Sequence, residues 1–239
     1  MPFPDAKILD QRDPLAPFRA RFSLPDGFIY LDGNSLGALP KSVVARLPSV
    51  VVTEWGRDLI TSWNRHDWID LPRRVGAKIA PLIGAEPGSV IVADSTSVNI
   101  FKLLAVALAK RPDRKVILTE EGNFPTDVYV AGGIASLMGQ GREVRLAKAG
   151  GLAEAMSEDV AVVLLTEVNY RTGARLDMRE LTGRAHEVGA LIVWDLCHSA
   201  GAVPVDLIAA DADFAVGCGY KFLNGGPGAP AFAYVAPRH

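Results

Sequence analysis

The chain has 239 residues, of which 49% are apolar, and its formal net charge is −2. This composition suits one large globular domain or somewhat more, and the interspersed charges exclude a polybasic surface for nucleic acid or membrane. The N-terminal residues lack the basic start and apolar core of a signal peptide, and no apolar run reaches the roughly 18 residues that span a bilayer. We therefore expect a cytoplasmic protein without nucleic-acid or membrane partners.

Residues 1–40 contain several prolines and predict an irregular N-terminal arm, interrupted by a short strand at residues 29–31. Spaced apolar residues then predict a helix over residues 41–63, with an interruption near Pro48, and a second helix over residues 71–83. We expect the arm to end near residue 40, where the main domain begins.

From residue 89 onward, short apolar runs alternate with helical patterns. The expected strands cover residues 89–93, 116–118, 144–147, 160–165, 191–194, 214–216 and 231–235. The expected helices cover residues 98–110, 126–137 and 179–188. Strands without polar alternation, separated by helices, are typical of a mostly parallel sheet covered on both faces. We therefore expect an α/β/α sandwich, in which ligands bind after the carboxyl ends of the strands.

The strongest candidate for catalysis is Lys221, which follows the apolar run at residues 214–216 and precedes a glycine-rich turn. A lysine at a buried strand end can attack a carbonyl, because burial lowers the pKa of its amine. Taken alone, this stretch fits a solvated lysine at a strand end better, since most lysines are exposed. The residues that follow the other strands change this interpretation.

Polar and aromatic residues follow the other strands. Residues 94–97 place three hydroxyl groups at a helix start, which suits a phosphate but is also typical of ordinary N-caps. Phe124 and Asp127 either face a planar ligand or simply start the next helix. Thr166 offers a hydroxyl group after its strand. Asp195 ends a buried strand, where a carboxylate is costly unless it is paired, for example with a pyridine nitrogen.

Asp195 and His198 form an Asp-x-x-His pair, which also suits a metal site. The sequence offers no further cluster of His, Cys or Glu with the spacing of metal ligands, so we expect no metal. One organic cofactor with a phosphate and a pyridine ring accounts for the hydroxyl-rich turn, the aromatic, the acid and Lys221 together. We therefore expect pyridoxal 5′-phosphate (PLP) as the cofactor.

Four motifs resemble those of kynureninases, which belong to the aspartate-aminotransferase-type (fold type I) PLP enzymes. They are LDGNSLG at residues 31–37, NFPTD at 123–127, DLCHSAG at 195–201 and GYKFLNGGPG at 219–228. The Asp-x-x-His and lysine motifs occur in many PLP families, whereas the NSLG and FPTD segments are much more specific to kynureninases. The resemblance covers nearly all of the chain from about residue 30 and implies a transferase-like PLP-binding large domain over residues 41–239.

The resemblance also implies a role for each matching residue. Lys221 would form the Schiff base with PLP, Asp195 would pair with the pyridine nitrogen, and Tyr220 would relay protons. Ser35 and Trp63 would lie toward the substrate. The residues expected to bind the cofactor are Thr96, Ser97, Phe124, Asp127, Thr166, Asp195, His198, Tyr220 and Lys221.

The reaction implied by the resemblance is hydrolysis of L-kynurenine, and of 3-hydroxykynurenine, to anthranilate and L-alanine in tryptophan catabolism, on the kynurenine pathway toward NAD biosynthesis. The family also implies a homodimer in the full-length form. Its members continue well past the lysine and add a small C-terminal domain, which is absent from this sequence after His239. We therefore expect residues 41–239 to form an incomplete large domain.

Two alternatives remain open. A cysteine desulfurase or selenocysteine lyase shares the PLP scaffold but needs a reactive cysteine over its substrate. Cys197 and Cys218 lie inside strand-end motifs, so we expect small buried thiols that pair only by coincidence of the fold. The other alternative is a truncated, non-catalytic PLP-binding fragment.

Overall fold

The computed structural model describes residues 5–148 and 150–239. Within these residues, a seven-stranded sheet has the strand order β3-β9-β8-β7-β6-β4-β5. Its strands are β3 (Val90–Val92), β4 (Val116–Glu120), β5 (Glu143–Ala147), β6 (Val160–Thr166), β7 (Leu191–Asp195), β8 (Phe214–Gly217) and β9 (Phe232–Val235). Strands β4 to β8 pair in parallel, whereas β9 is antiparallel to both β8 and β3. The expected mostly parallel sheet is confirmed.

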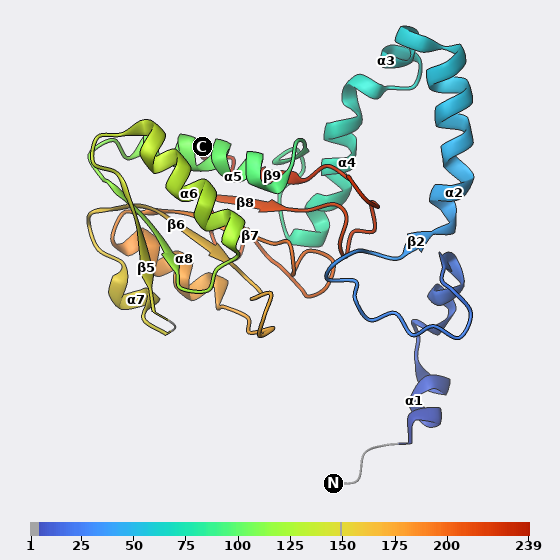
Figure 1. Cartoon of the computed structure of the whole chain (residues 1–239), viewed down its shortest axis with the longest axis horizontal. Helices are drawn as coiled ribbons and strands as arrows, with labels where there is room; N and C mark the ends of the chain where they lie inside the picture. Colours follow the sequence, from blue (N-terminus) through green and yellow to red (C-terminus); the bar gives the residue numbers. More distant parts are fainter. Residues whose placement is uncertain (1–4, 149) are drawn as a thin grey trace.

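Helices cover both faces of this sheet (Figure 1). On one face lie α5 (Thr96–Lys110) and α6 (Pro125–Met138). On the other lie α7 (Leu152–Ala155) and α8 (Met178–Glu187). The expected α/β/α sandwich is therefore confirmed, and each long helix begins within about two residues of its expected start.

The core consists of two hydrophobic clusters, one on each side of the sheet. Successive residues of β4 alternate between them, since side chains of a strand point to opposite faces: Val116 and Leu118 join one cluster and Ile117 the other. The indole Nε1 of the fully buried Trp194 donates a hydrogen bond of 3.1 Å to Oγ1 of Thr182. This bond satisfies the polar atoms of both buried side chains and fixes α8 against β7.

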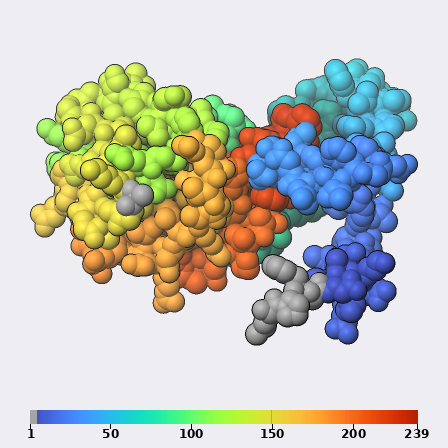
Figure 2. All heavy atoms as spheres, turned by 60° about the horizontal axis from the view of Figure 1, so that its bottom comes forward, coloured from blue at the N-terminus to red at the C-terminus, as the bar shows by residue number. Residues whose placement is uncertain are grey.

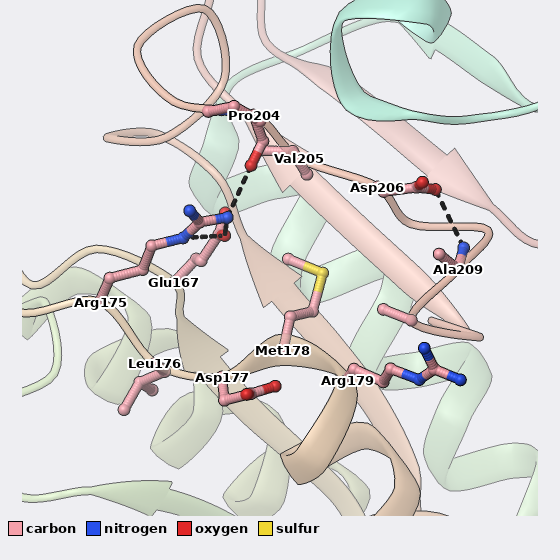
Figure 3. Close-up of a pocket in the computed structure, with 11 residues that line it drawn as sticks. Glu167, Arg175, Leu176, Asp177, Met178, Arg179, Pro204, Val205, Asp206 and Ala209 are labelled. Atoms are coloured by element: carbon pink, nitrogen blue, oxygen red, sulfur yellow. Dashed lines mark hydrogen bonds and ion pairs between the residues drawn. The ribbon is translucent and has the colours of Figure 1, made fainter.

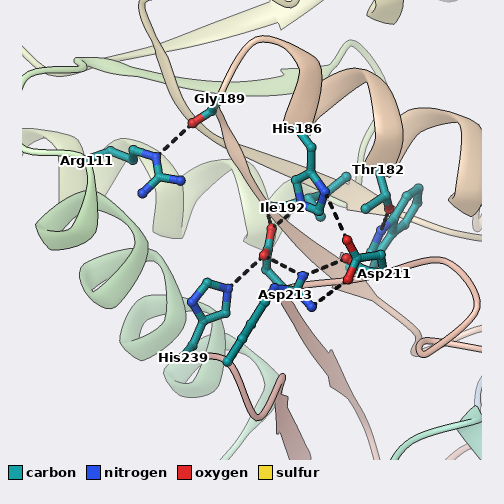
Figure 4. Close-up of polar contacts among 10 residues, drawn as sticks. Arg111, Thr182, His186, Gly189, Ile192, Asp211, Asp213 and His239 are labelled. Carbon is teal, nitrogen blue, oxygen red and sulfur yellow. Dashed lines mark hydrogen bonds and ion pairs between the residues drawn. The ribbon is translucent and has the colours of Figure 1, made fainter.

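A cluster of ion pairs around Asp213 lies at the amino-terminal ends of the parallel strands, opposite to their carboxyl ends. Asp213, just before β8, is 1% exposed and accepts a hydrogen bond of 2.9 Å from the backbone N–H of Ile192. Its carboxylate also pairs with His186, Arg238 and His239 (Figure 4). Burial alone raises the pKa of this carboxyl, but its hydrogen bonds outweigh burial and hold the pKa well below its ordinary value. The ion cluster ties α8, β7, β8 and the segment after β9 together.

Strand β5 lies at one end of the sheet and has a single neighbour, β4, among the described strands. Glu143 and Leu146 of this strand are exposed, Val144 and Arg145 are half-buried, and Ala147 is buried. The guanidinium of Arg145 forms a two-armed ion pair with Asp159, which precedes β6. A charge pair therefore links the outermost strand β5 to the start of β6.

The residues before β3 form an arm that projects from one end of the sandwich (Figures 1 and 2). Along the arm, the elements are α1 (Ala6–Arg12), η1 (Ala16–Arg21), β1 (Phe22–Ser23), β2 (Leu39–Pro40), α2 (Lys41–Pro48), η2 (Ser49–Arg57), η3 (Leu59–Thr61), α3 (Ser62–Arg65), η4 (Trp68–Asp70), α4 (Leu71–Ile79) and η5 (Ala80–Ile83). Helix α4 returns to the body beside β3, where Gly76 lets the helix approach the carbonyl group of Val90.

The arm differs from the sequence prediction in two respects. Residues 29–31 form no strand, because Ile29 and Leu31 are 80% and 86% exposed and no described strand pairs with them. The segment before residue 41 contains the short helices α1 and η1 rather than only irregular chain. The interruption expected near Pro48 is confirmed: Pro48 ends α2 and the chain continues as the π-helical η2, because proline lacks the N–H of the regular helical ladder.

Among the helices of residues 5–148 and 150–239, none has both the length and the apolar character to cross a membrane.

Candidate functional site

Strand register brings distant residues to one edge of the sheet. Thr166 at the end of β6 pairs with Asp195 at the end of β7, and Asp195 pairs with Val216 of β8. Lys221 lies in the turn that follows β8. Because the carboxyl ends of adjacent parallel strands meet at the same edge, these residues converge although more than fifty positions separate the first from the last.

A cavity of about 180 Å³ opens at this edge. The expected cofactor-binding residues that line it are Thr96, Ser97, Phe124, Asp127, Thr166, Asp195, His198, Tyr220 and Lys221. Ser95, Thr126, Tyr170 and Cys197 complete the lining. The two residues expected near the substrate are not part of it: Ser35 lies in the loop at residues 31–37, and Trp63 is 49% exposed on α3.

Lys221 is the most shielded of the described lysines, with 8% of its surface exposed, while the other seven are classed as exposed. Its Nζ lies 2.7 Å from Nε2 of His198 and 5.8 Å from the ring centroids of Phe124 and Tyr220. Burial and the charge of Lys221 lower the pKa of His198. A neutral His198 imidazole therefore accepts a hydrogen bond from the Lys221 ammonium group.

Two buried carboxyl groups share the cavity, Asp127 at 2% exposure and Asp195 at 3%. Burial and the neighbouring Asp195 charge raise the pKa of Asp127 to about 9. Asp127 is thus a neutral carboxylic acid at pH 7, and its Oδ2 has no hydrogen-bond partner among the described residues. Asp195 Oδ1 accepts a hydrogen bond of 2.7 Å from the backbone N–H of Cys197. The side chain of Asp127 faces the cavity and does not cap α6, whose N-cap is Phe124.

The start of α5 lies at one side of the cavity. Ser95 is its N-cap, and its hydroxyl accepts a hydrogen bond of 3.3 Å from the backbone N–H of Val98. The hydroxyl groups of Thr96 and Ser97 lie beside the cavity. A helix N-terminus offers free N–H groups and a positive dipole end, which together favour an anion such as a phosphate. The N-cap interpretation is confirmed for Ser95, and phosphate binding by Thr96 and Ser97 stays a prediction.

Two supporting residues escaped the sequence analysis, Asn123 and Tyr170. Asn123 Oδ1 accepts hydrogen bonds from Thr166 Oγ1 at 2.6 Å and from the backbone N–H of Phe124 at 2.7 Å. Tyr170 packs edge-on against Phe124, with ring centroids 5.2 Å apart. Asn123 is the first residue of the NFPTD motif, and this position was the sequence feature that could have identified it. Its link to Thr166 joins residues 43 positions apart and depends on the fold.

A larger hollow of about 600 Å³ lies beside Glu167, the residue after Thr166 (Figure 3). Its polar groups mostly serve the fold: Arg175 pairs with Glu167 and donates to the carbonyl of Pro204. Asp206 accepts a hydrogen bond from the backbone N–H of Ala209. None of the residues expected from the sequence analysis lines this hollow, so the smaller cavity at Lys221 is the candidate site. In the described part of the chain, no group of three or more His, Cys, Asp or Glu side chains is placed to hold a metal ion.

The sequence matches one protein-family model and is similar to several curated proteins. Residues 29–232 match the model of the family described as aminotransferase class-V. Over 97% of its length, the chain is 61% identical to a kynureninase from Deinococcus radiodurans, and over 98% it is 54% identical to a kynureninase from Pseudomonas fluorescens. It spans only 57% and 58% of the length of these two curated relatives.

Among solved structures, the chain resembles a C-DES variant that has glycine covalently linked to its PLP cofactor. The match has a TM-score of 0.77 at 18% identity and covers 92% of this chain and 60% of the other. At that identity the likeness shows the fold alone. Cysteine desulfurases also appear among the solved structures of similar fold.

Proposed function

The chain belongs to the aminotransferase class-V family, and on that basis we propose that it forms the PLP-binding part of an enzyme that hydrolyses L-kynurenine. The products are anthranilate and L-alanine, and 3-hydroxykynurenine is a second substrate. The observation that carries this proposal is the 61% identity to a curated kynureninase over nearly the whole chain. Tryptophan catabolism is the pathway that such an activity serves. A cytoplasmic location stays a prediction.

The chemistry of the cavity supports PLP as the cofactor. Thr96 and Ser97 at the start of α5, together with Tyr220, suit the phosphate, and Phe124 suits the face of the ring. The Asp195 carboxylate suits the protonated ring nitrogen. The orphaned Oδ2 of Asp127 is a buried polar atom that still needs a partner, which a polar group of a bound ligand provides. Thr166 and His198 complete this polar lining.

When bound, PLP supplies a carbonyl that condenses with amines and a ring that draws electrons from the bonds of the substrate α-carbon. Lys221 would be the nucleophile for that carbonyl, and its free amine would be the base that takes a proton from the substrate α-carbon. His198, 2.7 Å from Nζ, accepts a hydrogen bond and holds the Lys221 amine in place. The Asp195 carboxylate would stabilise the positive charge of the protonated ring nitrogen.

Tyr220 is the proton donor in this proposal. Burial raises the pKa of its phenol, so the hydroxyl stays protonated at neutral pH and can donate a proton to the departing carbon. The phenol lines the same cavity as Lys221, and the Lys221 Nζ lies 5.8 Å from its ring centroid. An acid and a base therefore stand on adjacent residues of one turn.

The full-length form is proposed to be a homodimer. Support comes from the arm, where Val52, Trp55 and Ile60 are 68%, 65% and 74% exposed. Large apolar side chains grouped on a projecting element are typical of protein contacts.

The test is an assay of kynurenine with added PLP, read as the fluorescence of released anthranilate, with Lys221→Ala as the negative control. Anthranilate from the parent protein but not from the variant is the expected result. The main alternative is a cysteine desulfurase, which shares the fold. It needs an accessible, reactive thiol, but Cys218 is 3% exposed, and its hydrogen bond to Cys197 and burial raise the pKa of Cys197. Sulfide released from cysteine, without anthranilate from kynurenine, would replace our proposal by that alternative.

A further inference from the structure

The fold brings the two cysteines of the chain together. Asp195 and Val216 form the last register pair of β7 and β8, and the Leu196 N–H still donates to the Val216 carbonyl at 2.8 Å. Cys197 and Cys218 each lie two residues beyond that register pair. Neighbouring strands run roughly 4.8 Å apart, which falls within the Cα separations of about 4.4–6.8 Å that disulfides span.

Direct contacts place both sulfur atoms in the same small space. Cys218 Sγ lies 3.8 Å from the carbonyl oxygen of Cys197. Cys197 Sγ also lies 3.6 Å from Oγ1 of Thr96. The two residues are free thiols, Cys218 buried and Cys197 half-buried. Cys197 lines the Lys221 cavity, so small solutes that enter the cavity reach this thiol.

The two thiols differ in character. The hydrogen bond from Cys197 and the nearby charge of Lys221 lower the pKa of Cys218. The hydrogen bond to Cys218, together with burial, raises the pKa of Cys197. The pair therefore holds two unlike thiols: Cys197 lines the cavity, and Cys218 is buried outside its lining.

The sequence positions of the pair link it to the site. Cys197 stands between Asp195 and His198, and Cys218 stands just before Tyr220 and Lys221. A disulfide between them would therefore join the segment that carries Asp195 and His198 to the segment that carries Lys221. The Cys197 sulfur that would enter this bond lies 3.6 Å from Thr96 Oγ1, at the start of α5.

We propose that Cys197 and Cys218 form a dithiol that peroxide oxidises to a disulfide, and that this disulfide weakens PLP binding at the adjacent cavity. One sulfur of the pair takes one oxygen from hydrogen peroxide and releases water. The other sulfur then displaces that oxygen as a second water, so that the thiols give up two electrons and two protons in all. The effect on PLP rests on the proposed function, whereas formation of the disulfide does not.

The first test follows the thiols alone. The cofactor-free protein is treated with hydrogen peroxide, digested without reductant and mapped by mass spectrometry. We expect one linked pair of peptides, containing Cys197 and Cys218, which separates on reduction. Two free thiols after treatment, or separate oxygen adducts on each cysteine, would overturn the proposal. This measurement needs no variant and no activity.

The second test measures the affinity for PLP by equilibrium dialysis, before oxidation, after oxidation and after reduction with dithiothreitol. We expect oxidation to weaken binding about tenfold or more and reduction to restore it. Cys218→Ala is the matched control, because Cys218 does not line the cavity, and its affinity for PLP should not respond to peroxide. Cys218→Ser serves if the alanine variant unfolds.

The outcomes of the two tests separate the claims. An unchanged affinity in the oxidised, disulfide-linked protein would overturn the proposal. The same peroxide response in the control variant would overturn it as well, because the effect would then not need Cys218. If the reduced protein binds no PLP at all, the proposed function fails, and the peptide map still decides whether the dithiol forms.

Discussion

The Nζ atom of Lys221 lies 2.7 Å from Nε2 of His198, although the two residues follow different strands. Burial and the Lys221 charge lower the pKa of His198, so the imidazole is neutral and acts as the acceptor. A lysine held in this way presents its amine in one direction, toward the cavity. The consequence can be tested on the lysine itself.

We predict that PLP attaches covalently to Lys221 and to no other lysine. Lys221 is 8% exposed in the candidate cavity, whereas the other seven lysines lie exposed to solvent, outside its lining. Borohydride reduction followed by peptide mapping gives the measurement. Lys102→Ala, at an exposed site, is the control and should label as the parent does. Label spread over several lysines would contradict the assignment.

Replacing Asp195 by asparagine should leave PLP bound but remove most activity from a preparation that hydrolyses kynurenine. The amide cannot balance the positive charge of the ring nitrogen, and loss of one such electrostatic contact costs on the order of 10²-fold in kcat. Asp113→Asn, at an exposed loop position, is the matched control. PLP content and kcat measured together decide the outcome, and near-normal kinetics of Asp195→Asn would refute the role.

Gly37→Ala should disturb the turn that carries Tyr220 and Lys221, although Gly37 lies far from this turn in the sequence. The backbone N–H of Gly37 donates a hydrogen bond of 2.8 Å to the carbonyl of Tyr220, and an added Cβ would overlap the carbonyl oxygen of Lys221. We expect a loss of about 1–3 kcal/mol of stability and weaker PLP binding. Gly33→Ala, where the new Cβ only touches the Phe222 ring at 3.5 Å, should behave like the parent. Equal behaviour of the two variants in denaturant unfolding and PLP dialysis would show that this contact is unimportant.

The Asp213 cluster predicts a defined loss of stability in acid. The folded-state pKa of Asp213 lies below its ordinary value of 3.8, so its contribution is complete above about pH 5 and is lost as pH falls through the folded pKa. Asp213→Asn should cost about 3 kcal/mol near neutral pH, and the gap to the parent should shrink below pH 4. Urea unfolding over a pH series gives the measurement.

The control for this prediction is Asp211→Asn. Asp211 pairs with the same Arg238 and His186, but its side chain is 68% exposed, so we expect a cost under about 1 kcal/mol. A similar loss from both variants would mean that burial of Asp213 does not strengthen its ion pairs.

The exposed apolar residues of the arm predict self-association. Val52, Trp55 and Ile60 lie on the projecting segment η2–η3, and such surfaces are rarely left open on monomers. We expect concentration-dependent association in sedimentation velocity, which Trp55→Asp should reduce without changing the secondary structure by circular dichroism. A monodisperse monomer that unfolds cooperatively, with or without the substitution, would argue against an interface on the arm.

Most of the sandwich was predictable because its strands are short, apolar and separated by helices. The run at residues 160–165, for example, became β6, whose seven residues are all buried. The direction of β9 was not predictable, since an apolar run fits either direction. The arm was the least predictable part, because Ile29 and Leu31 are apolar yet exposed and their pattern has no packing partner.

The candidate cavity was largely predictable, because carboxyl strand ends converge in any sheet of this kind. What escaped prediction depends on register. The bond from Thr166 to Asn123 and the meeting of Cys197 with Cys218 require knowledge of which strands are neighbours. The placement of Ser35 and Trp63 near the substrate stays a prediction, and neither residue lines the cavity.

The charged residues of β5 affect whether molecules of this protein can associate through this edge strand. An unpaired strand edge is a template for edge-to-edge β-pairing, which leads to aggregates. Arg145, held by Asp159, and the exposed Glu143 place charges along that edge, and an incoming strand would have to displace or bury them. We expect these charges to disfavour continuous sheets across molecules, so that the self-association predicted for the helical arm would not extend through β5.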